Sequence, residues 1–321
     1  MYLGIEIGGT KLQLGLGEGD GVLAGLWRAH VDVAQGPEGI RRQITAAVPE
    51  LLARAGVGRS EVRGIGIGFG GPVDDATHTV IQSHQIEGWD GFPLADWVSD
   101  LVGLPAVLGN DADVAGLAEA LHGAGKGLSP IFYITIGSGI GGGLIINGEI
   151  YRGVGRGAAE IGHLRMAVED HMDVCLCWSP LEELASGWGI EERAKLACRN
   201  AQGSPLWQLV GGELDNITAQ HVALAAEQDD GLARWILEEA WDHLAEAICH
   251  VITLLCPRRI VIGGGVSLIG EQLLFAPLRR AVAQRVFRPF AGLTDVVPAA
   301  LGEEVVVHGA LALARKRLGL A

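Results

Sequence analysis

The sequence predicts an α/β protein with mixed sheets, built as two lobes. The chain has 321 residues, which is too long for one compact core, so we expect two lobes. Apolar stretches typical of strands alternate along the chain with stretches whose apolar residues recur at helical spacing. Hydrophobic residues make up 49% of the chain and charged residues 19%, a balance typical of a folded globular protein.

Three apolar strands run into turns rich in glycine. They are LGIEIGGTKLQLGL at residues 3–16, GIGIGFGGPVD at 64–74 and FYITIGSGIGGGLIING at 132–148. The first and third share one layout of strand, turn of small residues and strand, which indicates a loose internal repeat and therefore a duplicated lobe. A fourth cluster, RIVIGGGVS at 259–267, predicts a short buried strand that ends in a glycine turn and leads toward a helix.

Four stretches between these strands are typical of helices. They cover residues 36–55, 110–122, 232–256 and 307–318. The second opens with Asn110, a good N-cap residue, and its apolar side chains fall on one face. This alternation of strands and helices is the main support for the α/β class.

Charge and cysteine content narrow the partners and the compartment. The formal net charge of −14 opposes non-specific attraction to nucleic acid or to an anionic membrane. No run approaches the roughly 20 apolar residues that span a bilayer, and MYLGIEIGG begins directly as a strand without a leader. Five cysteines, at positions 175, 177, 198, 249 and 256, read as reduced thiols. We therefore expect a cytoplasmic protein with neither a nucleic-acid nor a membrane partner.

Two glycine turns are candidates for binding phosphate. Residues 8–11 (Gly8, Gly9, Thr10, Lys11) and residues 137–143 lie where a strand turns back, and glycine lets backbone N–H groups approach an anion. Either turn alone is better explained by a tight hairpin that binds no ligand. Two matched turns in one acidic chain favour a nucleotide held between two lobes. Neither turn matches GxxxxGK[ST], and the GxGxxG here precedes a strand, which is not the dinucleotide-binding pattern.

Asn110 and Asp111 form a candidate catalytic pair. They lie at a strand-to-helix junction, where the helix N-terminus stabilises a carboxylate. Asp111 is placed to accept a proton from a hydroxyl nucleophile, as an aspartate does in phosphoryl transfer to alcohols. Taken alone, the pair is better explained as a helix cap that has no catalytic role.

Seven motifs taken together resemble the ROK family of cytoplasmic bacterial sugar kinases, open reading frames and repressors. In chain order they are EIGGTK, GFGGPVD, GNDADVAGLAEALHGAGKG, TIGSGIGGGLIINGEIYRG, GAAEIGH, LEELASG and VIGGGVS. The resemblance covers nearly the whole chain. It implies the actin-like, ribonuclease-H-like ATPase fold, with two lobes around a central cleft for ATP and sugar. The smaller lobe would comprise residues 1–109 plus 302–321, and the larger lobe residues 110–301.

The resemblance also implies a set of site residues. Asp111 would be the general base. The ATP-binding residues would be Glu6, Gly8, Gly9, Thr10, Lys11, Thr135, Gly137, Ser138, Gly139, Gly264 and Gly265. The sugar-binding residues would be Gly71, Asn110, Asp111, Glu160, His163 and Glu182. Carboxylates, an amide and an imidazole suit the hydroxyl groups of a hexose, each of which both donates and accepts hydrogen bonds.

The function implied by the resemblance is ATP-dependent phosphorylation of a hexose, glucose or a close relative, on its 6-hydroxyl with Mg²⁺. Alternatives are an N-acetylhexosamine or fructose kinase of the same family, or a catalytically impaired sugar-binding protein. The last is motivated by Glu6, where the family has Asp, while Gly70 and Gln85-Ile86 also depart from the family pattern and leave the sugar open. A repressor is disfavoured because the first hairpin begins at residue 3, without room for a helix-turn-helix domain. Family members are often dimers or tetramers, so a homo-oligomer is compatible with the sequence.

A structural zinc is predicted to be absent. In the family the histidine of EIGH binds zinc together with three cysteines of CxCGxxGCLE. Aligned on Leu181-Glu182, this chain has Asp173, Cys175 and Pro180 at the three cysteine positions. His163, Asp173, Cys175 and Cys177 remain an alternative ligand set. We predict instead that residues 164–180 are held by packing, and the expected apolar anchors are Met166, Val168, Met172, Val174 and Trp178.

Overall fold

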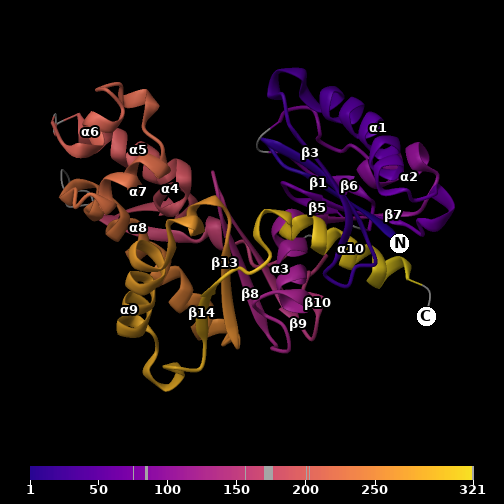
Figure 1. The fold of residues 1–321 in the computed structure, drawn as a ribbon. Helices are drawn as coiled ribbons and strands as arrows, with labels where there is room; N and C mark the ends of the chain where they lie inside the picture. Colours follow the sequence, from indigo (N-terminus) through magenta and orange to yellow (C-terminus); the bar gives the residue numbers. More distant parts are fainter. Residues whose placement is uncertain are drawn as a thin grey trace. The chain divides into compact units, whose positions relative to one another are not determined.

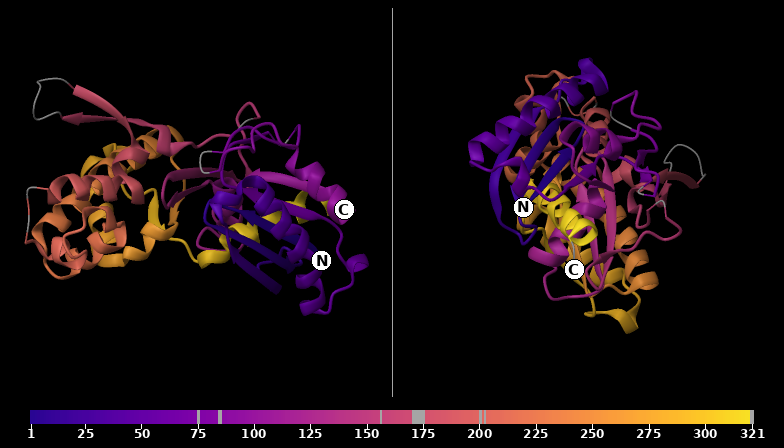
Figure 2. Two further views of the ribbon diagram at one scale, coloured as in Figure 1. Left: turned by 90° about the horizontal axis from the view of Figure 1, so that it is seen from above. Right: turned by 90° about the vertical axis from the view of Figure 1, so that its right-hand side faces the viewer.

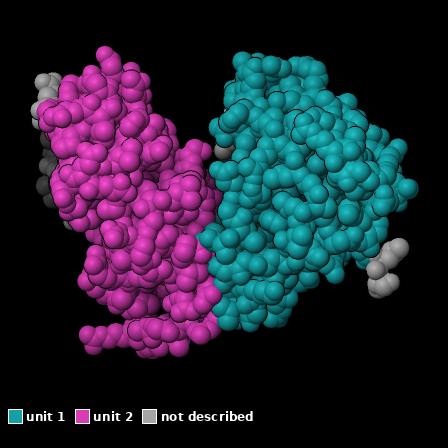
Figure 3. Space-filling model, in the orientation of Figure 1, with its two compact units in different colours: residues 1–133, 143–158, 299–321 teal, residues 134–142, 159–298 magenta. Residues whose placement is uncertain are grey.

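The computed structural model divides the chain into two compact units, which Figure 3 distinguishes by colour. It describes residues 1–74, 76–83, 86–155, 157–169, 176–199, 201 and 203–319. Unit 1 comprises residues 1–133, 143–158 and 299–321, and unit 2 comprises residues 134–142 and 159–298. Residues 110–133 and 143–158 pack with unit 1, whereas the expected lobe boundary followed residue 109. The predicted division into a smaller lobe, residues 1–109 plus 302–321, and a larger lobe, residues 110–301, stays a prediction.

Unit 1 contains a five-stranded sheet with the strand order β3-β2-β1-β4-β7 (Figure 1). Its strands are β1 (Tyr2–Ile7), β2 (Lys11–Gly17), β3 (Leu23–His30), β4 (Ile65–Phe69) and β7 (Ala106–Asn110). Strands β1, β2 and β3 are antiparallel neighbours, and β4 and β7 continue the sheet parallel to β1. Two further short strands, β5 (Val73–Asp74) and β6 (Thr79–Val80), pair with each other.

The second five-stranded sheet repeats this order as β10-β9-β8-β13-β14. Its strands are β8 (Ile131–Ile136), β9 (Ile140–Ile146), β10 (Glu149–Ile150), β13 (Arg259–Gly263) and β14 (Asp295–Pro298). In both sheets three strands consecutive in sequence are followed by two strands from farther along the chain. The predicted internal repeat is therefore confirmed as a repeat of topology.

The described helices include α1, α3, α8 and α10, which agree closely with the four predicted stretches, and others that were not predicted. They are α1 (Gly36–Ala55), α2 (Leu94–Val102), α3 (Asp111–His122), α4 (Leu181–Ala185), α5 (Gly187–Cys198), α6 (Pro205–Leu209), α7 (Ala219–Glu227), α8 (Gly231–Leu255), α9 (Ala276–Arg285) and α10 (Val305–Leu318). The helix expected soon after β13 begins only at Ala276. Gly264 and Gly270, with φ of 84° and 90°, leave the helical conformation and bound a 3₁₀ segment between them. None of the helices in the described ranges combines the length and apolar character needed to cross a membrane.

Many of the 49 glycines permit close packing and do not form turns. In unit 1, α10 lies against β1, β4 and α3 (Figure 1). A Cβ atom on Gly66 of β4 would lie 1.8 Å from the Ala310 carbonyl oxygen, and one on Gly309 would lie 1.9 Å from that of Val114. Only glycine allows backbones to approach this closely. The glycine content thus holds α3, where the candidate base lies, tightly against the sheet of unit 1.

In unit 2, β11 (Arg165–Glu169) and β12 (Leu176–Pro180) form a separate antiparallel hairpin. Figure 2 shows this hairpin extending away from the helices of the unit. Met166 is buried, as expected of an apolar anchor, and Val168 is partly buried. Trp178 is 55% exposed, so its prediction as an anchor is wrong. In an antiparallel ribbon alternate side chains point to opposite faces, and only one face of this hairpin finds a packing partner.

Candidate functional site

The parallel strands of unit 1 end in one row. Ile7 of β1 is level with Phe69 of β4, and Phe69 is level with Asn110 of β7. Gly8, Gly70 and Asp111 therefore follow at the same edge of the sheet, and the Gly70 N–H donates to the Ile7 carbonyl over 2.9 Å. In open α/β sheets ligands bind outside the carboxyl ends of the strands. The structure thus brings the predicted phosphate turn and the predicted base together.

Asn110 caps α3 and ties it to the neighbouring loop. Its side-chain oxygen accepts hydrogen bonds from the backbone N–H groups of Ala112, at 2.9 Å, and Asp113, at 3.2 Å. Its amide nitrogen donates to the Gly71 carbonyl oxygen over 3.0 Å. The capping role is therefore confirmed, and it fixes the first turn of α3, on which Asp111 lies. Asp111 Oδ2 lies 3.5 Å from the position that a Cβ on Gly70 would occupy, so the carboxylate faces this glycine loop.

Gly71 has a structural reason to be glycine. A Cβ atom there would lie 2.7 Å from the carbonyl oxygen of Gln82 and 3.2 Å from the ring of Phe69. The close approach of the Gln82 carbonyl and the Phe69 ring therefore requires glycine at this position. The sugar-binding role of Gly71 remains a prediction.

Glu6 is held in a closed network beside the first glycine turn. Lys11 Nζ lies 3.2 Å from Glu6 Oε1, and Gln13 Nε2 donates to Glu6 Oε2 over 2.8 Å. Lys11 and Gln13 both also donate to the Glu303 carbonyl oxygen, at 2.9 and 3.0 Å. Burial raises the pKa of Glu6 to about 7, against the opposing effect of Lys11. The sequence predicts that Lys11 supplies positive charge to a phosphate. In the structure its ammonium group forms an ion pair with the Glu6 carboxylate.

The second glycine turn, residues 137–139 between β8 and β9, is fixed by contacts within unit 2. Glu182 Oε2 accepts a hydrogen bond from the Ile140 N–H over 2.8 Å, and a Cβ on Gly139 would lie 2.2 Å from that oxygen. At the end of β13, a Cβ on Gly264 would lie 2.5 Å from the Ile136 carbonyl. The structure therefore brings the predicted residues Thr135, Gly137, Ser138, Gly139, Glu182, Gly264 and Gly265 together. Glu182 is predicted to bind sugar. In the structure one of its carboxylate oxygens accepts a hydrogen bond that holds this turn.

Glu160 directly precedes the 3₁₀ turn Ile161–His163, and His163 is its last residue. Both side chains are exposed. The turn packs on β9, because a Cβ on Gly162 would lie 2.1 Å from the Ile140 carbonyl. The preceding residue, Ala159, has a left-handed φ of 68°, unusual for alanine. The segment before the turn thus has a constrained backbone that fixes the direction in which Glu160 leaves it.

A cavity of about 710 Å³ in unit 2 begins at the second glycine turn. Three predicted ATP-binding residues, Gly137, Ser138 and Gly265, line it. The others are Gly187, Trp188, Glu191, Thr218, Ala219, Gln220, Ala223, Leu224, Glu227, Val266, Leu268 and Ile269. Its volume lies within the roughly 300–1,000 Å³ range of small-molecule sites. Val266 belongs to the motif VIGGGVS and Gly187 to LEELASG, which Trp188 directly follows. The rest of the lining, apart from the three predicted residues, was not identified from sequence.

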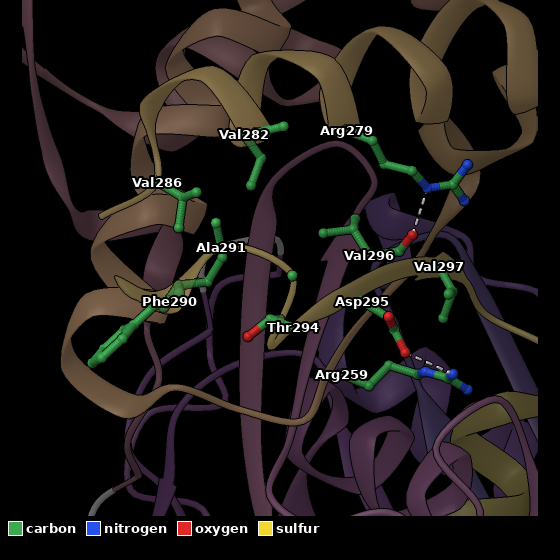
Figure 4. Close-up of a pocket in the computed structure, with 13 residues that line it drawn as sticks. Arg259, Arg279, Val282, Val286, Phe290, Ala291, Thr294, Asp295, Val296 and Val297 are labelled. Atoms are coloured by element: carbon green, nitrogen blue, oxygen red, sulfur yellow. Dashed lines mark hydrogen bonds and ion pairs between the residues drawn. The ribbon is translucent and has the colours of Figure 1, made fainter. Parts of the chain in front are cut away.

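A second cavity in unit 2, of about 560 Å³, lies between α9 and β14 and contains none of the predicted site residues (Figure 4). Arg259 pairs with Asp295 over 3.0 Å, and Arg279 Nε donates to the Val296 carbonyl oxygen over 2.7 Å. Valine side chains and Phe290 make up much of the remaining wall. Both arginines are thus engaged in holding the edge of the sheet.

The predicted zinc ligands are described only in part. Asp173 and Cys175, and the expected anchors Met172 and Val174, lie outside the described residues. Cys177 lies on β12 and is an exposed free thiol. The absence of a structural zinc stays a prediction.

The residues around the glycine turn of unit 1 fit magnesium that arrives with a nucleotide. Mg²⁺ in kinases keeps several waters and is held through one or two carboxylates and the phosphates of the substrate. Such a site needs no cage of protein ligands, and the residues that the structure describes contain no group of three or more His, Cys, Asp or Glu placed to form one. When bound, the ion would neutralise charge on the transferring phosphoryl group.

Comparison with known proteins decides the family. The ROK family model matches residues 2–317. The chain belongs to the ROK family. A glucokinase of Thermotoga maritima is 31% identical over 319 residues, which cover 99% of this chain and 98% of that protein. An N-acetylmannosamine kinase of Escherichia coli is 29% identical, with 98% of both chains covered.

Among solved structures, a ROK family glucokinase from Streptomyces griseus in complex with glucose and AMPPNP is similar throughout. Its TM-score is 0.81 at 32% identity, covering 98% of this chain and 99% of that chain. The actin-like ATPase fold predicted from the motifs is therefore confirmed for this ROK protein. These relationships establish it as an ATP-dependent sugar kinase.

Proposed function

We propose that this ROK kinase transfers the γ-phosphoryl group of ATP to the 6-hydroxyl of glucose or a closely related hexose, with Asp111 as general base. The observation that carries the proposal is the position of Asp111 on the first turn of α3, at the edge of the sheet where Gly8 and Gly70 also lie. The names of the similar glucokinases support glucose as the first sugar to test.

The local chemistry supports Asp111 in this role. Asn110 fixes the first turn of α3 through two hydrogen bonds and ties it to the Gly71 carbonyl through a third, so the carboxylate beside it starts from a defined backbone position. The positive end of the α3 dipole favours the ionised carboxylate, which is the form that can accept the hydroxyl proton. The hydroxyl oxygen would then attack the γ-phosphorus in line with the leaving oxygen of ADP.

The nucleotide would occupy the 710 Å³ cavity of unit 2. Its phosphates would lie at the turn formed by Gly137 and Ser138, where backbone N–H groups and a hydroxyl are available. The base and ribose would fill the rest of the cavity. The predicted sugar-binding roles of Glu160, His163 and Glu182 are part of the same proposal.

A substrate panel tests the proposal. Purified protein with Mg-ATP is given glucose, mannose, fructose, N-acetylglucosamine and N-acetylmannosamine, and sugar-dependent ADP release is measured for wild type and Asp111→Asn. Removing a general base lowers turnover by about 10²- to 10⁴-fold. We expect the highest kcat/KM with glucose and a loss of that size in the variant.

Other outcomes of this panel separate the alternatives. A preference for N-acetylmannosamine, the substrate named for the Escherichia coli relative, would assign a different sugar to the same chemistry. Sugar binding by calorimetry without any turnover would support an impaired protein and contradict the proposal. Equal rates for wild type and Asp111→Asn would exclude Asp111 as the base.

A further inference from the structure

Trp188 is a large aromatic side chain that the core of unit 2 does not use. It lines the 710 Å³ cavity and is 50% exposed, whereas Trp241 in the same unit is almost fully buried. A tryptophan at the wall of a concave site offers a flat apolar face to a ligand. Its neighbours in the cavity wall include Val266 and the 80% exposed Leu268, which add further apolar surface.

The backbone fixes Trp188 next to the glycine turn proposed for the phosphates. The Gly187 N–H donates to the Gly137 carbonyl oxygen over 2.7 Å, and a Cβ on Gly187 would meet that oxygen at 2.7 Å. Ser186, which is fully buried, caps α5 by accepting a hydrogen bond from the Gly189 N–H over 3.1 Å. Trp188 therefore has a defined position one residue away from a direct contact with the turn.

The charged side chains in the described wall of the cavity are carboxylates. Glu191 and Glu227 line it, and its described lining contains no Lys, Arg or His. Glu191 is held in place because its Oε1 accepts a hydrogen bond from the Ala219 N–H over 3.2 Å. Carboxylates repel phosphates but accept hydrogen bonds from amino and hydroxyl groups. The part of the cavity beyond the glycine turn thus suits a neutral base and ribose.

We propose that Trp188 is the side chain on which the adenine base of ATP stacks, and that this contact contributes to the affinity of the protein for nucleotide. The inference rests on the proposed placement of the nucleotide in this cavity. Every base has a π face, and stacking on an aromatic side chain contributes about 1–3 kcal/mol when tested by alanine substitution.

The experiment compares the binding of a nucleotide, which carries adenine, with the binding of a polyphosphate that lacks it. Affinities for Mg-AMPPNP are measured by calorimetry, and inorganic tripolyphosphate is measured as a competitor of ATP. The proteins are wild type, Trp188→Ala, Trp188→Phe and Trp235→Ala. Trp235 is a matched control, because it is 43% exposed on α8, lies outside the cavity and has the Arg193 guanidinium 4.7 Å from its ring.

We expect Trp188→Ala to weaken Mg-AMPPNP about 5- to 150-fold, which is the stacking contribution converted at 1.4 kcal/mol per tenfold. Its inhibition constant for tripolyphosphate, its KM for sugar and its kcat at saturating ATP should stay unchanged. Trp188→Phe should restore most of the affinity, and Trp235→Ala should behave as wild type.

Two results would overturn the inference, and a third would overturn the proposed function on which it rests. Unchanged AMPPNP affinity in Trp188→Ala would show that adenine does not stack on Trp188. If wild type binds ATP in that case, the proposed function still stands. An equal loss for AMPPNP and tripolyphosphate would show that Trp188 supports only the phosphate turn. Failure of wild type to bind AMPPNP at all would instead overturn the proposed function itself.

Discussion

Glu6 stands where the resemblance to the ROK family implies Asp, and the structure gives the longer side chain a defined environment. Gln13 and Lys11 each hold one of its oxygens, and both are fixed by the same Glu303 carbonyl. Gln13 is almost fully buried, so this is not a surface contact. Since only the longer side chain carries its carboxylate this far from the backbone, we interpret Gln13 as the partner that accommodates Glu6.

Stability should depend on pH through Glu6. The pKa of Glu6 in the folded protein, about 7, lies above the ordinary glutamate value of 4.5, so the folded state binds more protons than the unfolded state between these pH values. The free energy of unfolding should therefore fall as pH rises from 4.5 to 7, by an amount on the order of 3 kcal/mol at 1.36 kcal/mol per pKa unit. Urea unfolding of wild type and Glu6→Gln at a series of pH values measures the difference. Parallel pH profiles of the two proteins would contradict this assignment.

At the scale of elements, α3 is held by a buried carboxylate near its C-terminal end. Glu119 is fully buried, and its Oε1 accepts hydrogen bonds from the backbone N–H groups of Ala300 and Leu301, both at 2.9 Å. Its Oε2 accepts from the Ala124 N–H over 2.7 Å. One side chain therefore joins the end of α3 to two separate chain segments of unit 1.

Replacing Glu119 by alanine should destabilise the protein severely. The substitution removes the buried carboxylate that accepts hydrogen bonds from the N–H groups of Ala300, Leu301 and Ala124, and a hydrogen bond to a charged group contributes about 1.5–3 kcal/mol. We expect a decrease in the free energy of unfolding of at least about 3 kcal/mol by urea titration. The control is Glu239→Ala, which breaks a partly exposed pair with Arg193 and should cost about 1 kcal/mol or less. Similar costs for both variants would contradict the anchoring role of Glu119.

The β11–β12 hairpin is the element for which a metal is predicted to be dispensable. In the register aligned on Leu181-Glu182, only one of the three cysteine positions implied by the resemblance holds a cysteine, and both glycine positions hold other residues. Elemental analysis of protein purified without chelator should give substoichiometric zinc. Cys175→Ser/Cys177→Ser should keep wild-type stability. One zinc per chain, lost together with folding in the double variant, would show the prediction to be wrong.

At the scale of the whole molecule, two sheets of the same strand order each present a glycine turn. In unit 1 the turn is accompanied by Glu6 and Asp111, and in unit 2 by Glu182 and the 710 Å³ cavity. The repeated topology has therefore been given different chemistry in its two copies. In the function proposed above, the first copy supplies the general base Asp111, and the second copy binds the adenine and ribose of the nucleotide.

Ligand binding should stabilise the folded chain as a whole. A ligand at 100 times its Kd that binds only folded protein adds about 2.7 kcal/mol to the free energy of unfolding. For a chain of this size that corresponds to a rise in Tm of about 5 °C. Calorimetry with Mg-AMPPNP, and separately with the preferred sugar, measures the shift. The open-chain alcohol of the same sugar is the control, and an equal shift with it would contradict specific sugar binding.

The sequence by itself determined the strands β1, β2, β4, β8, β9 and β13, the helices α1, α3, α8 and α10, the N-cap at Asn110, the two glycine turns and the family. These features follow from local periodicity, cap chemistry and short motifs, which act over a few neighbouring residues. Only the tertiary structure decided that Ile7, Phe69 and Asn110 end in one row and that Gly66 and Gly309 serve close packing. It also decided that Gln13 holds Glu6 and that Trp188 lines a cavity with Gly265. These contacts join residues whose partners are fixed by strand register and by packing between distant segments, and no local pattern encodes such partners.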